Sequence, residues 1–185
     1  MNTRTQLHTH SLVIMALFTA VLCVSAYISI PLPAGSHITF LNFVVLLIAF
    51  LFPIQQSFLI TLVWLLLGAA GAPVFVGANA GISYLIGGWG GYSFGFLTVA
   101  ILVPLLRKKE FHRGSYTIIS VFAATLIDII GALWLMIITG ISVRQAVFMG
   151  IIPFLPLDLI KAVVVVQIVP QLRTIVQADL HSPSS

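Results

Sequence analysis

Charge is the scarcest property of this chain. Only 6% of its 185 residues are Asp, Glu, Lys or Arg, whereas soluble domains carry about 25%. No such residue occurs between Arg4 and Arg107. So few charges cannot cover the surface of a soluble globule, and a hydrophobic content of 60% excludes an intrinsically disordered chain. The composition therefore predicts an integral membrane protein, with the lipid bilayer as its surroundings.

Further absences narrow the range of functions. The one cysteine, Cys23, lies in an apolar run, so the chain cannot form an internal disulfide. The sequence has no G-x-x-x-x-G-K-[ST] motif and no H-E-x-x-H motif, which argues against ATP hydrolysis by this chain and against a zinc hydrolase. His37 has no partner at metal-ligand spacing, and the few basic residues lie at segment ends. We therefore expect no enzyme, no metal, no cofactor and no nucleic-acid partner.

Six mostly apolar segments are predicted as membrane-spanning helices. They cover residues 11–30, 38–52, 55–71, 91–106, 115–139 and 156–175. Six crossings place both termini on one side, which Arg4, the basic cluster 107–113 and Arg173 share, and the positive-inside rule makes that side cytoplasmic. We therefore predict an all-α membrane protein in three parts: a cytoplasmic segment 1–10, a single six-helix domain 11–175 and a polar cytoplasmic tail 176–185.

The loop between the third and fourth predicted helices is rich in glycine and must be external. Nine of the fourteen glycines fall between residues 68 and 95. Irregular backbone near a membrane is tolerated where it is buried in protein or lines a cavity. Asn79, Tyr84, Trp89 and Tyr92 add hydrogen-bonding groups and flat apolar faces, a mixture that suits a small, partly polar ligand. The alternatives are tight helix packing for the glycines and a place in the interfacial aromatic belt for Trp89.

Besides Arg173 at the cytoplasmic end of the sixth predicted helix, three charged residues fall inside predicted helices, where each costs about 2.5–3.5 kcal/mol on insertion scales. Asp158 and Lys161 are three residues apart, so they share one face near the external end of the sixth helix. They could bind an amide-bearing or zwitterionic ligand, or neutralise each other in a salt bridge. Asp128 lies in the middle of the fifth helix. It could relay protons, but without a second acid or a histidine nearby in that span we expect a structural role.

The first predicted helix carries a pair of small residues four apart. Ala16 and Ala20 form an A-x-x-x-A pattern, which makes a groove against which another helix can pack. Alanine is common in membrane spans, so chance also explains such a pair. By itself the pair indicates little.

Four stretches resemble the BioY family, the biotin-binding S components of energy-coupling factor (ECF) transporters. They are ISIPLPAGSHIT (28–39), LGAAGAPVFVGANAGISYLIGGWGGYSFGF (67–96), GALWL with ISVRQA (131–135 and 141–146) and PFLPLDLIKA (153–162). The resemblance implies a multi-pass protein of the cell membrane that has biotin as its transported ligand. It also implies three partner subunits, a membrane T component and two cytoplasmic ATPases. In the wider S-component group a small-xxx-small pair on the first helix meets the T component, and Ala16 and Ala20 match it.

The predicted function is therefore capture of biotin from outside, followed by release into the cytoplasm when ATP is hydrolysed by the partner subunits. Asn79, Tyr84, Trp89, Tyr92, Asp158 and Lys161 are the predicted ligand-binding residues. The alternative is a self-sufficient, ion-coupled secondary transporter of a small vitamin-like solute, with Asp128 and Asp158 as proton sites. The sequence shows no inverted repeat, which counts against this alternative.

Overall fold

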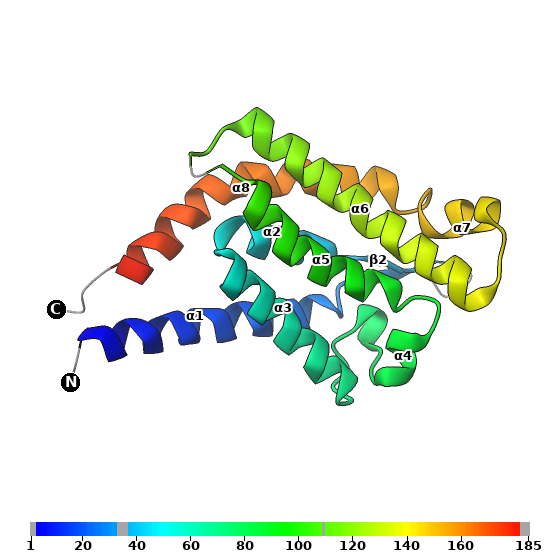
Figure 1. The fold of residues 1–185 in the computed structure, drawn as a ribbon, viewed down its shortest axis with the longest axis horizontal. Coiled ribbons are helices and arrows are strands. Elements are labelled where there is room, and N and C mark those ends of the chain that lie inside the picture. The colour runs from blue at the N-terminus through cyan, green and yellow to red at the C-terminus, as the bar shows by residue number, and fades with distance from the viewer. Residues whose placement is uncertain (1–2, 33–36, 109, 182–185) are drawn as a thin grey trace.

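The structure, a computed structural model, describes residues 3–32, 37–108 and 110–181. Helices dominate the described part of the chain, and they lie lengthwise beside one another (Figure 1). The start of the first helix and the end of the last lie at one end of the molecule, and α4 and α7 lie at the other. The elements are α1 (Thr3–Ser25), β1 (Ser29–Pro31), β2 (His37–Thr39), α2 (Leu41–Leu51), α3 (Ile54–Ala69), the 3-10 turn η2 (Val76–Ala78), α4 (Ile82–Ile86), α5 (Gly91–Leu106), α6 (Arg113–Thr139), α7 (Val143–Gly150) and α8 (Leu155–His181).

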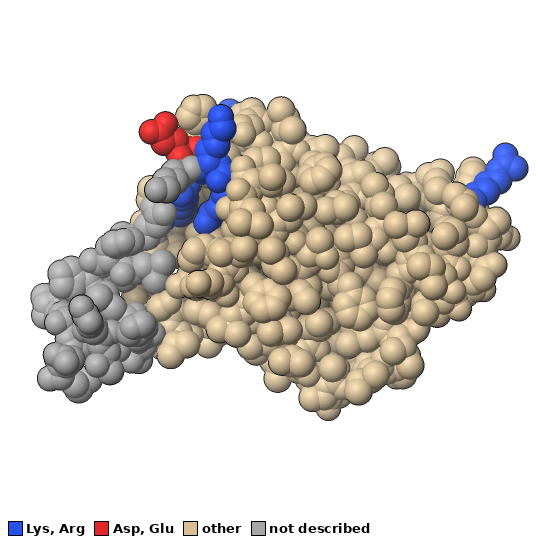
Figure 2. All heavy atoms as spheres, viewed as in Figure 1, with Lys and Arg blue, Asp and Glu red and all other residues tan. Residues whose placement is uncertain are grey.

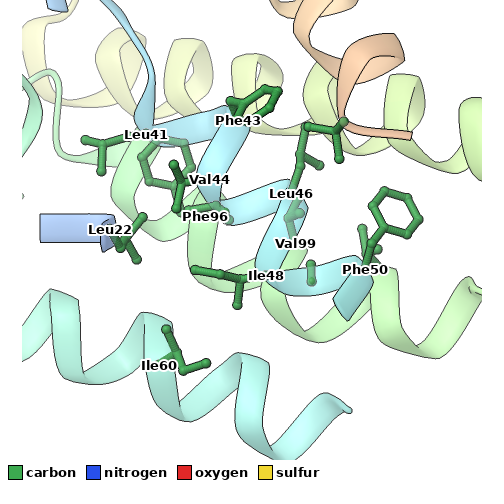
Figure 3. Close-up of a cluster of buried hydrophobic side chains, with 14 of the residues drawn as sticks. Leu22, Leu41, Phe43, Val44, Leu46, Ile48, Phe50, Ile60, Phe96 and Val99 are labelled. Atoms are coloured by element: carbon green, nitrogen blue, oxygen red, sulfur yellow. The ribbon is translucent and has the colours of Figure 1, made fainter. Parts of the chain in front are cut away.

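Helix α2 forms the centre of the bundle. Ten of its eleven residues are buried, as expected for a helix that is apolar on all sides. It packs against α5 and α8, with α1 and α3 beside it, and Figure 3 shows the side chains of Leu22, Ile60 and Phe96 gathered around it. A helix of this length extends only about 16 Å, roughly half of the hydrocarbon core of a bilayer. The second predicted segment, 38–52, thus contributes a short helix that is enclosed by the other helices of the bundle.

A small hairpin follows α1, which corrects the prediction of a purely α-helical chain. Strands β1 and β2 pair antiparallel, with Ile30 opposite Ile38 and Pro31 opposite His37. The first helix consequently ends at Ser25 instead of continuing to residue 30, because the following residues turn into the extended β1 strand. Pro31 is tolerated there because an edge strand does not need every backbone N–H. Residues 33–36 of the predicted external loop lie outside the described residues.

The remaining long helices agree with the predicted segments to within a few residues, except at the chain ends, whereas the short helices α4 and α7 lie outside the six predicted segments. Helices α3, α5 and α6 begin and end close to the predicted bounds. Helix α1 already includes residues 3–10, and α8 continues to His181 in the predicted polar tail. Residues 182–185 lie outside the described part. The N-terminal segment and most of the tail are therefore continuous with the first and last helices.

The outer faces of the helices are apolar, as lipid contact requires. Leu17 on α1 is 60% exposed, and Ile118 and Ile137 on α6 are 72% and 70% exposed. Lys and Arg side chains stand near the two ends of the face seen in Figure 2, and the surface between those ends is uncharged. Helix α6 and the part of α8 from Leu155 to Val176 are each long and apolar enough to cross a membrane. These features are those of a membrane protein.

The glycine-rich segment is folded back against the end of α3. Trp64 on α3 donates its indole N–H to the carbonyl oxygen of Val74 at 2.8 Å, and the Gly81 N–H bonds the carbonyl oxygen of Gly68 at 2.7 Å. Gly77 has a φ of +69°, and a Cβ there would lie 2.7 Å from the His37 imidazole. A glycine is needed at this position on both counts. The segment therefore closes over the bundle as one wall of an internal space.

Candidate ligand-binding site

A cavity of about 230 Å³ lies between the hairpin, the glycine-rich segment and helices α2, α5, α6 and α8. Ligand pockets usually measure about 300–1,000 Å³, so this cavity suits a small ligand. Its wall combines polar side chains with aromatic and aliphatic ones. The lining residues are His37, Thr39, Asn42, Val76, Asn79, Tyr84, Trp89, Tyr92, Phe96, Ile127, Asp128, Phe154 and Asp158.

The predicted ligand-binding residues gather at this cavity although they come from two separate parts of the chain. Five of the six line it directly, and they are Asn79, Tyr84, Trp89, Tyr92 and Asp158. Lys161, the sixth, is not a lining residue and lies behind Asp158. The structure thus brings the glycine-rich segment and the sixth predicted helix to one place.

The ion pair of α8 fixes one side of the cavity. The Lys161 ammonium lies 2.7 Å from Oδ1 of Asp158, and the two side chains are 17% and 9% exposed. The ammonium also donates to the carbonyl oxygen of Thr39 at 2.7 Å and to Oδ1 of Asn42 at 3.3 Å. An ammonium has three N–H groups, and all three are engaged. Lys161 therefore joins α8 to β2 and α2, and it holds the Asp158 carboxyl at the cavity wall.

An aromatic cluster forms another part of the cavity wall. The rings of Trp89 and Tyr92 stack with centroids 6.0 Å apart, and Phe154 meets Tyr92 edge-on at 5.7 Å. The Tyr92 hydroxyl donates to the carbonyl oxygen of Gly150 at 2.5 Å. A Cβ at Gly131 on α6 would overlap the Tyr92 ring, so this glycine leaves the space in which the ring lies. Such flat, fixed faces are suited to stacking against a ring of a ligand.

Tyr84 and Asn79 complete the wall on the side of the glycine-rich segment. Tyr84 stacks on Phe75 with centroids 5.0 Å apart, and burial raises the pKa of its hydroxyl, which therefore stays neutral. The Asn79 amide nitrogen donates to the carbonyl oxygen of Val76 at 2.8 Å. This bond fixes the amide so that its oxygen remains available as an acceptor.

Two polar atoms at the cavity have no hydrogen-bond partner within the described residues. They are Nδ1 of His37 and Oδ2 of Asp128, and both are buried. Buried polar groups are nearly always hydrogen-bonded, so these two atoms are exceptions in the cavity wall. Asp128, for which the sequence favoured a structural role, thus belongs to the cavity wall.

Sequence reasoning missed several wall residues for different reasons. His37 was considered only as a metal ligand, and Asp128 was judged by its own span, whereas the nearby acid, Asp158, comes from α8. The cost of an acid inside a membrane was the signal that could have identified Asp128. Phe96 and Phe154 look like ordinary core residues in the sequence, and no signal distinguishes them.

The two predicted docking residues do not line the cavity. Ala16 and Ala20 are both exposed on the outer face of α1, so they are accessible to a partner helix, and their docking role stays a prediction. Residues 91–95 read GYSFG and match the G-x-S-x-G pattern of serine hydrolases. However, Ser93 lies inside α5, is 1% exposed and is preceded by turns instead of a strand. It is therefore not a nucleophile elbow.

Comparison with known proteins places this arrangement in a family. The model of the BioY family matches residues 1–178. The chain belongs to the BioY family. It is 35% identical to the biotin transporter BioY of Thermotoga maritima over 85% of this chain and 92% of that protein. It is 32% identical to the biotin transporter BioY2 of Lactococcus lactis subsp. cremoris over 84% and 86% of the two chains.

The fold of this BioY-family chain matches a solved structure as well. A crystal structure of the S-component for biotin from an ECF-type ABC transporter superposes with a TM-score of 0.84 at 25% sequence identity. The match covers 94% of this chain and 95% of the other. The chain therefore has the S-component fold. The family and these relatives are transporters and not enzymes, which confirms the prediction that the chain is not an enzyme.

Proposed function

We propose that the chain is the biotin-binding S component of an ECF-type vitamin importer. The observation that carries this proposal is the convergence of Asp158, Asn79 and the aromatic residues Trp89 and Tyr92 on one small cavity. The cavity offers acceptors and flat rings together, which is the combination that a fused bicyclic urea requires. Two relatives that are named biotin transporters support the same ligand.

The ureido group and the fused bicycle of biotin both find suitable chemistry in the cavity. The ureido N–H groups require acceptors, for which the carboxyl of Asp158 and the amide oxygen of Asn79 are available. The bicycle packs against Trp89, Tyr92 and Tyr84. A nanomolar Kd corresponds to about 12 kcal/mol. Spread over the roughly 16 non-hydrogen atoms of biotin, this is about 0.8 kcal/mol per atom, below the ceiling of about 1.5 kcal/mol. One small, ordered cavity is therefore sufficient.

The arrangement in the membrane follows from the charge distribution. We infer a multi-pass protein of the cell membrane with six crossings and cytoplasmic termini, in which Arg107, Arg113 and Arg173 lie on the cytoplasmic side. The cavity then lies toward the outer side of the membrane, at the level of the hairpin and the glycine-rich segment. Biotin is captured there and released into the cytoplasm.

Release requires energy that this chain cannot supply. The sequence has no nucleotide-binding motif, so we assign ATP hydrolysis to two cytoplasmic ATPase subunits that act through a membrane T component. The exposed small residues Ala16 and Ala20 on α1 are the proposed contact with the T component. The chain itself needs no cofactor, since biotin is its cargo.

Titration of biotin into the purified chain in detergent, followed by calorimetry, tests the ligand. We expect saturable binding to one site per chain, and no binding of a control vitamin without a ureido ring. The absence of biotin binding by the folded protein would refute the assignment. Reconstitution of the chain alone into vesicles tests the need for partners. Accumulation of biotin driven by an ion gradient would favour the self-sufficient secondary transporter instead.

A further inference from the structure

A tight turn carries Trp89 to the cavity wall. The Gly90 N–H bonds the carbonyl oxygen of Gly87 at 3.1 Å, and this bond closes a turn over residues 87–90. Trp89 lies inside the turn, and its side chain lines the cavity. The other residues of the turn are all glycine, which loses more backbone freedom on folding than any other residue. The turn therefore needs an anchor outside itself if Trp89 is to keep one position.

Helix α6 supplies this anchor through Trp134. The indole N–H of Trp134 donates to the same carbonyl oxygen of Gly87 at 2.9 Å, so this oxygen accepts both the closing bond of the turn and a bond from α6. The Trp134 ring also packs on Phe94 of α5, with centroids 5.1 Å apart. A Cβ at Gly91, the first residue of α5, would overlap the Cβ of Trp134. Trp134 thus packs against the start of α5, and its polar end reaches the turn.

Trp134 is half-buried and does not itself line the cavity. Three residues earlier on α6, Gly131 leaves the space in which the Tyr92 ring lies. The same stretch of α6 therefore contacts both the Tyr92 ring and the turn of Trp89, and these two rings stack on each other with centroids 6.0 Å apart. This stretch is GALWL (131–135), for which the sequence indicated no role of its own.

We propose that Trp134 is a positioning residue, which fixes the turn 87–90 so that the Trp89 ring presents one face to the bound ligand. This inference rests on the proposed function, because the fused bicycle of biotin is the group that packs against Trp89. A ring that is already fixed loses little further freedom when the ligand binds, and such preorganisation raises affinity. Without the indole donor, Gly87 is still bonded to Gly90, so we expect a folded chain with a looser turn.

A double-mutant cycle tests whether Trp134 acts through Trp89. Biotin affinity is measured by calorimetry in detergent for the full chain, for Trp134→Phe, for Trp89→Leu and for the double variant. Phenylalanine keeps an aromatic ring but removes the N–H donor, so we expect Trp134→Phe to weaken binding by about fivefold or more. Trp89→Leu should weaken binding by about tenfold or more. In the Trp89→Leu background, Trp134→Phe should change affinity by less than about twofold, because the ring that it positions is gone.

Two further variants separate positioning from a general loosening of the glycine-rich segment. Trp64→Phe removes an indole donor from another part of this segment, where Trp64 bonds the carbonyl oxygen of Val74. The factor by which Trp64→Phe changes affinity should be the same with and without Trp89. Thr125→Val is the control on α6, because the Thr125 hydroxyl bonds only a carbonyl oxygen of the same helix, and this variant should bind like wild type.

Three results of the cycle would overturn the inference. They are wild-type affinity in Trp134→Phe or in Trp89→Leu, an equal loss from Trp134→Phe in both backgrounds, and the same dependence on Trp89 for Trp64→Phe as for Trp134→Phe. Failure of wild type to bind biotin at all would instead refute the proposed function.

A measurement on the wild-type chain decides the matter if Trp134→Phe does not fold. A ligand whose affinity depends on the Trp134 bond must by linkage hold that bond closed by the same factor. We therefore expect biotin to slow hydrogen exchange at the Trp134 indole N–H, followed by NMR, by about fivefold or more. Exchange at the Trp64 indole should slow less. An unchanged rate at Trp134, or equal slowing at the two indoles, would overturn the inference.

Discussion

Replacement of Lys161 by methionine tests the organisation of the cavity most directly. The ammonium makes three bonds, to Asp158, Thr39 and Asn42, and its side chain is only 17% exposed. Methionine preserves the apolar stem but leaves the carboxyl of Asp158 without its cation. Removal of one partner from a desolvated charge pair costs about 2–5 kcal/mol. We therefore expect Lys161→Met to bind biotin about 30-fold to several thousand-fold more weakly.

Calorimetric titration of the variant in detergent measures this loss, and Lys108→Met is the matched control. Lys108 is exposed at the far end of the bundle, so its variant should bind like wild type. The double variant Lys161→Met with Asp158→Leu separates folding from binding. It removes both charges, so thermal stability should recover toward wild type, whereas binding should stay lost because the acceptor is also gone.

Two results would refute the reasoning about this pair. Binding by Lys161→Met within about threefold of wild type would mean that the ammonium does not organise the cavity. Recovery of binding in the double variant would mean that Asp158 contributes no contact to the ligand. Either result would leave the pair with a role in membrane folding alone.

Three further predictions concern other parts of the structure. Ala16→Leu fills the outer groove of α1, so we expect biotin binding to be unchanged and uptake by the complete transporter to be lost, and unchanged uptake would remove this docking face. Tyr92→Phe leaves the Gly150 carbonyl oxygen unpaired, which should lower the free energy of unfolding by about 1–2 kcal/mol in a denaturation assay, with little change in affinity. Gly131→Ala displaces the Tyr92 ring and should weaken biotin binding by about tenfold or more in a calorimetric titration, whereas Gly114→Ala, which meets open space on the same helix, should not.

Hydropathy was sufficient to predict where most of the helices lie. Helices α3, α5 and α6 each follow an apolar run bounded by proline, glycine or charge, and their observed bounds are close to the predicted ones. Helix α8 begins close to its predicted start but continues to His181. The same signal could not reveal the enclosure of α2, because an apolar helix surrounded by protein and one surrounded by lipid have similar compositions. It also extended the first helix into β1, since Ile28 and Ile30 suit a strand as well as a span.

The candidate site was only partly predictable for a related reason. Asp158, Lys161 and the polar residues of the glycine-rich segment stand out in an uncharged sequence, and the structure brings them together. The relation between Asp128 and Asp158 depends on how α6 packs against α8, and no local pattern carries that information. The bonds from Lys161 to Thr39 and Asn42 likewise join residues more than a hundred positions apart.

Because α2 is enclosed by protein, its residues should tolerate fewer aliphatic substitutions during evolution than residues that face lipid. Lipid tails adapt to almost any aliphatic outline, so Val, Ile and Leu should exchange freely on the outward faces of α1 and α6. The neighbours of α2 are close-packed side chains with fixed shapes, and they do not adapt in this way. In a library of aliphatic substitutions selected for biotin-dependent growth, the positions that tolerate the fewest substitutions should therefore cluster between Leu41 and Leu51. At these positions the shape of a side chain matters more than its hydrophobicity.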